Sequence, residues 1–195
     1  MKIEKIILAS QSLRRSQLLK WAEIPFEVNI AETDESYPGH LSPAEIAMHI
    51  AFNKAIAVKK NIEEVKTNGN VYPILAADTI VILENKIIGK PSGRDEAIKT
   101  LTILSGRTHS VITGVCILSA EKKIIFAEKT LVEFYTLSQE QIEYYVDKYK
   151  PYDKAGAYAI QEWIGVTGIR SISGDFYNVM GLPVSRILRE LHTLG

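Results

Sequence analysis

Ile74-Leu75-Ala76-Ala77-Asp78-Thr79-Ile80-Val81-Ile82-Leu83 is the most apolar strand candidate in the chain. A continuous apolar run of this length is typical of a buried strand. Asp78 interrupts the run, and a buried carboxylate is costly unless it is paired, hydrogen-bonded or bound to a metal. A structural hydrogen bond at the end of a strand is the simpler explanation, but apolar residues continue on both sides. We therefore interpret Asp78 as a functional residue, either a metal ligand or a general base.

Strands and helices alternate on both sides of this stretch. Ile6-Ile7-Leu8-Ala9 predicts a second buried strand, and Ser42 with Glu45 forms a capping box that predicts a helix from Pro43 to about Lys60. The other predicted helices cover 12–22, 94–104, 139–149 and a segment opened by Leu182-Pro183; the other strands cover 26–30, 109–118 and 124–135; a turn is predicted at 68–70, and tight turns with short strands over 156–181. This order predicts a single α/β domain with a mixed sheet over residues 1–195.

The composition excludes several classes of protein. The chain has 195 residues, and its 23 basic and 23 acidic residues leave no net charge, which argues against a general nucleic-acid binder. The one cysteine, Cys116, lies in an apolar run and is interpreted as buried filler. A single cysteine excludes a disulfide within the chain, and no apolar run approaches the roughly 20 residues that span a bilayer. We therefore expect a soluble cytoplasmic protein that binds neither membranes nor nucleic acid.

A phosphate site is suggested by Ser10-Gln11-Ser12-Leu13-Arg14-Arg15, between the first predicted strand and helix. Two arginines at a helix N-terminus are unfavourable, because the free N–H groups there already carry positive potential. A bound anion removes this conflict, and hydroxyls, amides and guanidinium groups together suit a phosphate chain. The alternative is that Ser12 only caps the helix and both arginines are solvated. The sequence has no Walker motif, which excludes a P-loop.

Further candidate residues lie elsewhere in the chain. Lys54 falls near the centre of the apolar stripe of its helix, so its ammonium either reaches back to solvent or points into a cleft. Lys90 lies between Gly89 and Pro91, which taken alone is an ordinary loop. Polar and very small residues mix over 153–161, where a ligand or backbone must come close. Glu32 follows a predicted strand and could supply a second metal-binding carboxylate. The four histidines lack zinc-ligand spacing.

Together these motifs resemble the Maf-like protein family. Leu8-Ala9-Ser10-Gln11-Ser12-Leu13-Arg14-Arg15 is similar to the opening LASxSPRR signature of that family. The other matching motifs, in chain order, are Glu32-Thr33, Asn53-Lys54-Ala55, Ala77-Asp78-Thr79, Gly89-Lys90-Pro91, Leu104-Ser105-Gly106 with His109, Asp153-Lys154-Ala155-Gly156 and Gly181-Leu182-Pro183. The sequence departs from the pattern at Leu13, where the family usually has proline, and at Ala159, where glycine often precedes Ile-Gln.

The resemblance implies a nucleoside triphosphate pyrophosphatase, a hydrolase of nucleotide metabolism that cleaves between the α- and β-phosphates with Mg²⁺ or Mn²⁺. It implies an elongated α/β fold similar to the inosine-triphosphate pyrophosphatases, with the ligand in a cleft between two lobes. Family members are usually cytoplasmic and often homodimeric. Arg14, Thr79 and Gln161 match the branch that acts on dTTP and UTP, whereas the branch that acts on 7-methylguanosine triphosphate typically has tryptophan in place of Arg14.

The resemblance also implies roles for individual residues. Asp78 is expected to be the general base that activates or positions the attacking water, and Glu32 to hold the metal with it. Lys54 and Lys90 are expected to be catalytic through their charge, and the expected substrate-binding residues are Ser10, Arg14, Arg15, Thr79, Lys154 and Gln161. Two other hypotheses stay open. One is a non-catalytic nucleotide-binding regulator of septum formation and cell division arrest. The other is a house-cleaning pyrophosphatase for non-standard purine triphosphates.

Overall fold

The computed structural model describes residues 5–65 and 72–194, and the turn expected at 68–70 lies outside them. The described residues form two compact units, which are considered separately below. The first unit comprises the described parts of Met1–Asp78, Thr113–Glu128 and Gly181–Gly195, and the second comprises Thr79–Ile112 and Lys129–Met180. This division does not test the expectation of a single domain over residues 1–195, which stays a prediction.

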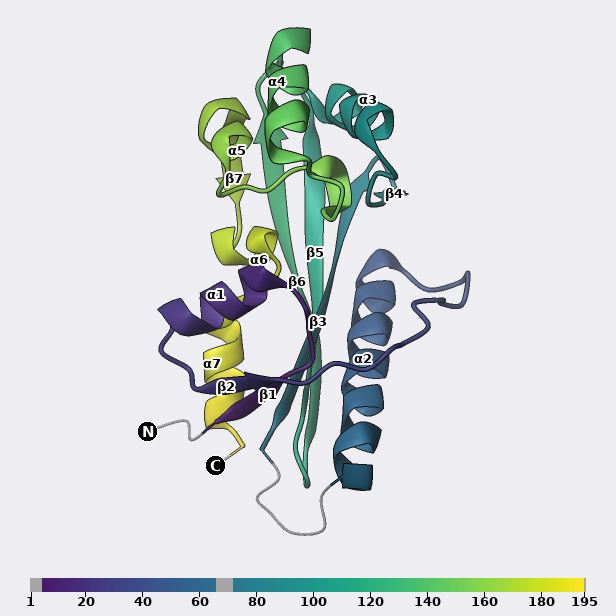
Figure 1. Ribbon diagram of the computed structural model, residues 1–195, viewed down its shortest axis with the longest axis vertical. Coiled ribbons are helices and arrows are strands. Elements are labelled where there is room, and N and C mark those ends of the chain that lie inside the picture. The colour runs from purple at the N-terminus through teal and green to yellow at the C-terminus, as the bar shows by residue number, and fades with distance from the viewer. Residues whose placement is uncertain (1–4, 66–71, 195) are drawn as a thin grey trace. The chain divides into compact units, whose positions relative to one another are not determined.

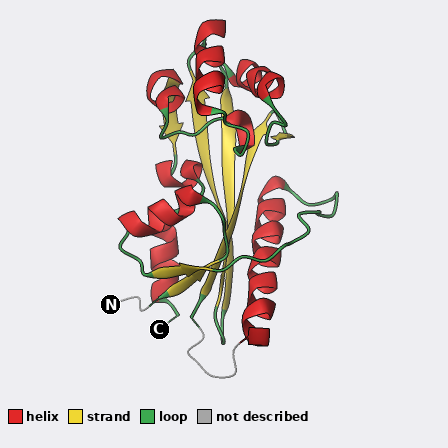
Figure 2. Cartoon of the chain, viewed as in Figure 1, coloured by secondary structure: helices red, strands yellow, loops and turns green. Residues whose placement is uncertain are grey.

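The described residues contribute seven strands to one sheet, drawn in yellow in Figure 2. The strands are β1 (Ile6–Leu8), β2 (Phe26–Val28), β3 (Ile74–Leu83), β4 (Lys86–Ile88), β5 (Thr108–Leu118), β6 (Lys123–Phe134) and β7 (Ile169–Ser173). Their order is β2-β1-β3-β5-β6-β7, with β4 paired to β3. β1 pairs in parallel with β2 and β3, whereas β4 and β7 pair antiparallel with β3 and β6. The prediction of an α/β fold with a mixed sheet is therefore confirmed.

Helices accompany the strands in both units. The helices of the first unit are α1 (Leu13–Trp21), α2 (Pro43–Val65) and α7 (Val184–His192). Those of the second unit are α3 (Arg94–Leu104), α4 (Gln139–Tyr149), the short 3-10 helix η1 (Ala155–Ala157), α5 (Trp163–Gly168) and α6 (Phe176–Met180). In the part of the chain that the structure describes, no helix is both long enough and apolar enough to cross a membrane.

The long helix α2 begins as the sequence predicts. The Ser42 N–H donates to the Glu45 carboxylate at 2.8 Å, and the Glu45 N–H donates back to the Ser42 hydroxyl at 3.4 Å. This reciprocal pair is the capping box. The predicted end near Lys60 is wrong, because the helix continues to Val65. Ile62 is buried in the core, and its packing extends the helix beyond the polar residues that had indicated an end.

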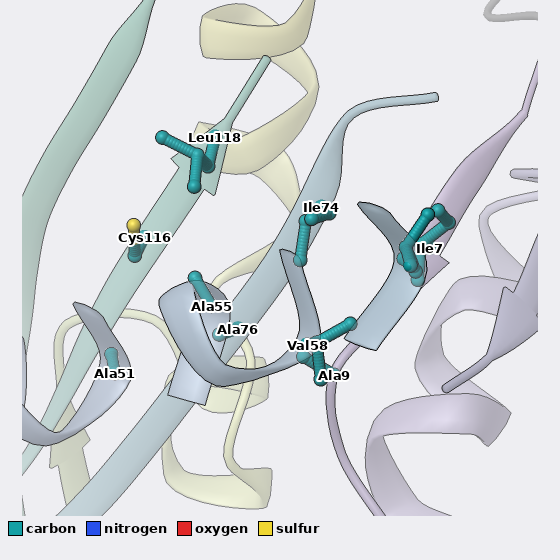
Figure 3. Packing of buried hydrophobic residues seen from close by; sticks show 10 residues of the cluster. Ile7, Ala9, Ala51, Ala55, Val58, Ile74, Ala76, Cys116 and Leu118 are labelled. Carbon is teal, nitrogen blue, oxygen red and sulfur yellow. The ribbon is translucent and has the colours of Figure 1, made fainter. Parts of the chain in front are cut away.

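The core of the first unit lies between α2 and the strands (Figure 3). Small side chains of α2, Ala51 and Ala55, face Ala76 of β3 and Cys116 of β5. Figure 1 shows α2 beside these strands and α7 on their other side. Burial raises the pKa of the Cys116 thiol to about 12, so it remains a neutral apolar group. The interpretation of Cys116 as buried filler is confirmed.

One glycine sets how closely α2 approaches the sheet. A Cβ atom on Gly114 of β5 would lie 2.2 Å from the carbonyl carbon of Ala47 and 2.3 Å from the amide nitrogen of Met48. Both neighbours are backbone atoms of α2, so a side chain at position 114 would have to push the helix away. The apolar sequence around Gly114 gave no indication of this contact.

Gly114→Ala should therefore destabilise the protein. We expect the free energy of unfolding to fall by about 2–4 kcal/mol, since overpacking here displaces a helix rather than a side chain. Urea unfolding followed by circular dichroism measures the change. The matched control is Gly39→Ala, because a Cβ atom at position 39 meets nothing within 4 Å. Equal stability of the two variants would contradict the close approach of α2 to β5.

In the second unit, short helices occupy about half of the glycine-rich segment. The expectation of tight turns with short strands over 156–181 is confirmed at β7 and at the turn that the Glu162 N–H closes on the Ala159 carbonyl oxygen, and it is wrong where η1, α5 and α6 form. Gly165 explains the difference. A Cβ atom there would lie 1.8 Å from the Ile160 carbonyl oxygen, so this glycine lets α5 pack on the preceding backbone instead of forming a turn. Gly181, shortly before the last helix, has a φ of 110°.

The hairpin after β3 has a two-residue turn. Lys86 pairs with Leu83 as the first residue of β4, which leaves Glu84-Asn85 as the turn. Both turn residues have positive φ values, 48° and 67°. That combination matches the twist of antiparallel strands.

A buried histidine belongs to the core of the second unit. The His109 ring stacks on Phe134 at 5.6 Å, and its Nε2 lies 2.7 Å from the Tyr158 hydroxyl. Burial lowers the pKa of His109 to about 4 and raises the pKa of Tyr158 well above its usual range. Both groups are therefore neutral at physiological pH.

This histidine should make the protein sensitive to mild acid. Between pH 6.5 and pH 4 the unfolded chain binds a proton at His109 that the folded chain does not, so the free energy of unfolding decreases as the pH falls. His109→Gln should remove about 3 kcal/mol of this decrease, measured by urea unfolding at several pH values. The control is His40→Gln, at an exposed position. Identical pH dependence of the two variants would exclude His109 as the source.

Candidate functional site

The parallel strands of the first unit bring three predicted segments to one edge of the sheet. The loop with Ser10 follows β1, and the loop with Glu32 follows β2. β3 pairs with β1 as far as Leu75, so Asp78 lies three residues beyond the paired part. Ligands of open α/β sheets bind at the carboxyl ends of parallel strands. This edge is therefore the candidate site in the first unit.

Asp78 is bound by the ammonium group of Lys54. Lys54 Nζ lies 2.7 Å from Asp78 Oδ1 and also 2.7 Å from Glu35 Oε1. The Lys54 and Asp78 side chains are mostly buried, at 19% and 15% exposure, whereas Glu35 is 52% exposed. The sequence left two alternatives for Lys54, an ammonium that reaches back to solvent and one that points into a cleft. The structure shows this ammonium in contact with Asp78. The pairing explains how a carboxylate is tolerated inside an apolar strand.

Glu35 is a site residue that sequence reasoning missed. It lies in the polar loop after β2, where Glu32, Asp34 and Glu35 follow one another closely and no periodicity distinguishes them. Asp34 has a local role, because the Ser36 amide and hydroxyl both donate to its carboxylate and lower its pKa. Glu32 is exposed. Its metal-binding role stays a prediction, while Glu35 is the carboxylate that shares Lys54 with Asp78.

The segment after β1 is held in place by Arg15. Its side chain is buried, with Nε donating to the Gly181 carbonyl oxygen at 2.8 Å and Nη1 donating to the Ser10 hydroxyl at 3.1 Å. Burial lowers the pKa of Arg15, and the nearby carboxylates of Asp78 and Glu35 oppose that shift. Arg15 therefore contributes positive charge close to the Asp78 group.

Ser12 caps α1, as the alternative to a phosphate site predicts, but the solvated Arg15 of that alternative is wrong because this side chain is buried. Its hydroxyl accepts from the Arg15 N–H at 3.4 Å, and its own N–H donates to the Ser10 hydroxyl at 3.2 Å. Leu13, where the Maf-like pattern has proline, is the exposed first residue of the helix. The helix start is therefore intact without proline. Arg14, next along the helix, is half-buried.

Four predicted residues belong to the second unit: Thr79, Lys90, Lys154 and Gln161. Thr79 is half-buried, and Lys90 and Gln161 are exposed. Lys154 is 8% exposed, and its ammonium lies 2.8 Å from Asp153 Oδ1 and 3.7 Å from Glu162 Oε1. The substrate-binding role expected of Lys154 stays a prediction, because these contacts are with its own chain.

Two motifs of the second unit meet through their backbones. The Gly156 N–H donates to the Gly89 carbonyl oxygen at 3.2 Å, which connects the segment before Lys90 with the segment after Lys154. Gly156 has a φ of 74°, and a Cβ atom there would lie 3.1 Å from the Val81 side chain. Glycine fits both the backbone conformation and the limited space.

The order of these motifs along the chain agrees with a comparison against protein families. The model of Maf-like proteins matches residues 5–194. This chain belongs to the Maf-like protein family.

Curated relatives of this Maf-like chain are similar over nearly its whole length. It is 48% identical to the dTTP/UTP pyrophosphatase of Parabacteroides distasonis, over 96% of this chain and 94% of the relative. It is 47% identical to the enzyme of that name from Bacteroides thetaiotaomicron, over 97% and 96%, and 47% identical to that from Bacillus cereus strain G9842, over 97% and 95%. Among solved structures, the Ham1 protein of Staphylococcus aureus matches 67% of this chain and 72% of its own, with 13% identity and a TM-score of 0.46.

The carboxylates of this Maf-like chain fit a hard divalent cation that is shared with a substrate. Magnesium is commonly held by one or two carboxylates together with substrate phosphates. Asp78 and Glu35 supply two carboxylates that converge on one point, the Lys54 ammonium. Among the described residues, no group of three or more His, Cys, Asp or Glu side chains could enclose a metal by itself. The chemistry of this donor pair therefore suits a cation that arrives with phosphate oxygens.

The contact between Lys54 and Asp78 should appear as an energetic coupling. Lys54→Met leaves the Asp78 carboxylate without its cation, and we expect the free energy of unfolding to fall by about 1–3 kcal/mol. In an Asp78→Asn background the same change should cost less, with a coupling above about 1 kcal/mol. Urea unfolding of the four proteins measures this difference.

The matched control for this cycle replaces the more exposed partner. Glu35→Gln removes the other carboxylate at the same 2.7 Å distance, and solvent should limit its coupling with Lys54 to less than about 1 kcal/mol. Additive effects of Lys54→Met and Asp78→Asn would show that the pair is not coupled.

Proposed function

We propose that this chain hydrolyses dTTP and UTP to the nucleoside monophosphate and pyrophosphate. Support for the reaction comes from membership of the Maf-like family and from relatives at 47–48% identity that are named dTTP/UTP pyrophosphatase. The structural observation that carries the proposal is the 2.7 Å contact between Lys54 and Asp78. It holds a carboxylate near the carboxyl ends of the parallel strands, at a position of the buried strand where an apolar side chain would be more stable.

In this proposal Asp78 is the general base. It accepts a proton from the attacking water as the new P–O bond forms and the bond to the bridging oxygen between the α- and β-phosphates breaks. Lys54 is the neighbouring catalytic cation, in contact with Asp78 before substrate arrives. Lys90 is the second catalytic cation, and its exposed ammonium is proposed to neutralise charge on the departing pyrophosphate.

The triphosphate is proposed to bind at the segment after β1. The Ser10 hydroxyl and the N-terminal end of α1 are suited to phosphate oxygens. Arg14 supplies a half-buried guanidinium group for direct contact. Arg15 adds positive charge and also holds Ser10 in position through its own hydrogen bond.

The cation is proposed to be Mg²⁺ or Mn²⁺. Asp78 and Glu32 are its proposed ligands, and Glu35 is a further carboxylate in contact with Lys54. When bound, such a cation neutralises phosphate charge and polarises the phosphoryl group. Lys54 and Arg15 provide part of the same neutralisation from the protein itself.

Recognition of the base is assigned to Thr79 and Gln161. A side-chain amide can pair with a pyrimidine edge through both its donor and its acceptor, and Gln161 is exposed to make such a pair. Lys154, which lies in the same unit as Gln161, is also proposed to contribute to substrate binding. The wider proposal includes a cytoplasmic homodimer and a role in cell division arrest, as the family resemblance implies.

The proposed function is tested by measuring pyrophosphate release from a panel of nucleoside triphosphates with Mg²⁺ or Mn²⁺. We expect turnover to be highest with dTTP and UTP, and Asp78→Asn to lower it by at least about a hundredfold because the general base is lost. Circular dichroism should show that this variant is folded.

The alternatives give different results in the same panel. Nucleotide binding without pyrophosphate release would favour a regulatory protein, and preference for non-standard purine triphosphates would favour a house-cleaning enzyme. Turnover by Asp78→Asn equal to that of the unmodified protein would remove Asp78 from catalysis.

A further inference from the structure

Gln161 lies in a tight turn that its neighbours close. The Glu162 N–H donates to the Ala159 carbonyl oxygen at 3.1 Å, so Ile160 and Gln161 are the two central residues. Ile160 is buried, whereas Gln161 is exposed. The position of the Gln161 amide therefore depends on how firmly the two ends of this turn, Ala159 and Glu162, are held.

One buried hydroxyl connects these two ends. Tyr145 of α4 is fully buried, and its hydroxyl accepts a hydrogen bond from the Ala159 N–H at 3.1 Å. The same hydroxyl donates to Glu162 Oε2. Both the donor and an acceptor position of this hydroxyl are thus used on the turn that carries Gln161. A phenylalanine would fill the same volume but make neither hydrogen bond.

The other oxygen of Glu162 faces a buried cation. Lys154 Nζ lies 3.7 Å from Glu162 Oε1 and 2.8 Å from Asp153 Oδ1. The side chains of Lys154 and Glu162 are 10% and 23% exposed, so solvent screens their attraction only partly. The carboxylate of Glu162 is therefore held between the Tyr145 hydroxyl and the Lys154 ammonium.

The backbone after the turn is equally constrained. The Glu162 carbonyl oxygen accepts from the N–H groups of Gly165 and Val166 at 2.9 and 3.2 Å, at the start of α5. A Cβ atom on Gly165 would lie 1.8 Å from the Ile160 carbonyl oxygen, so the backbone of α5 packs directly against the turn. Side-chain contacts from α4 and backbone contacts from α5 thus fix the same four residues, 159–162.

We propose that Tyr145 and Glu162 are positioning residues that set the selectivity for the pyrimidine base by fixing the turn that presents Gln161. Lys154 acts with them by holding the Glu162 carboxylate. This inference rests on the proposed function, because it explains the enzyme's selectivity for the base by residues that need not touch the nucleotide. In this inference the buried Lys154 contributes to substrate recognition indirectly, through its contact with Glu162.

The test compares the selectivity of Tyr145→Phe with that of the unmodified protein. We expect the ratio of kcat/KM for dTTP to that for dGTP to fall by about threefold to tenfold, which corresponds to the loss of one or two hydrogen bonds. The fall should come from a higher KM for dTTP, since Asp78 and Lys54 are unchanged. A purely structural role would lower activity on both nucleotides together and leave the ratio constant.

A double-mutant cycle shows whether the effect passes through Gln161. Gln161→Ala alone should lower the same ratio, and adding Tyr145→Phe to it should change the ratio by less than about twofold. Glu162→Gln retains an oxygen that can accept from the Tyr145 hydroxyl, so it should keep more of the selectivity than Glu162→Ala.

Tyr149→Phe is the matched control for Tyr145→Phe. Tyr149 lies one turn further along α4 and stacks on the Tyr145 ring at 5.0 Å, so the control removes a neighbouring hydroxyl from the same helix. It should leave the ratio unchanged. Thermal unfolding of each variant shows whether a lower ratio accompanies a loss of stability.

The outcomes separate the two proposals. If the unmodified protein releases no pyrophosphate from any nucleotide, the proposed function is wrong and this inference falls with it. If it favours dTTP and UTP but folded Tyr145→Phe keeps the ratio, only the inference is overturned. Equal effects of Tyr145→Phe with and without Gln161 would overturn it as well.

Discussion

The ion pair between Asp78 and Lys54 is the interaction on which the first unit depends. β3 has to be apolar to lie in the sheet, yet it carries a carboxylate in its middle. Removing that carboxylate from water costs several kcal/mol unless a cation accompanies it. Lys54 can do so only if α2 lies close to the strands, and Gly114 together with the alanines of α2 permits that distance. The close packing of α2 on the strands is therefore also what allows Lys54 to contact Asp78.

The cationic side chains at this edge of the sheet differ in their exposure to solvent. The Arg15 side chain is buried and that of Lys54 is mostly buried, whereas Arg14 is half-buried. Buried cations with fixed partners shape the local potential without having to reorganise. The more accessible ones can approach an incoming anion directly. This distinction between two adjacent arginines is not visible in their sequence pattern.

The sequence was informative where a local rule applies. The capping box at Ser42, the burial of Cys116 and the mixed sheet all follow from short patterns, and all are observed. Long-range contacts were harder to foresee. Glu35 looks like any acid of a polar loop until α2 brings Lys54 to it. In the sequence, a glycine that allows close backbone packing, such as Gly165, looks the same as a glycine in a turn. For this reason helices of the second unit were predicted as turns and strands.

The hydrogen bond from Arg15 to the Gly181 carbonyl joins residues that are 166 positions apart. The first unit is likewise assembled from the beginning, the middle and the end of the chain. During synthesis, chains emerge from the N-terminus onward and segments fold as their partners become available. Arg15 leaves the ribosome 166 residues before Gly181, and this anchoring contact forms only after Gly181 has been added. A chain with this connectivity completes the contacts of its segment after β1 only once Gly181 has been synthesised.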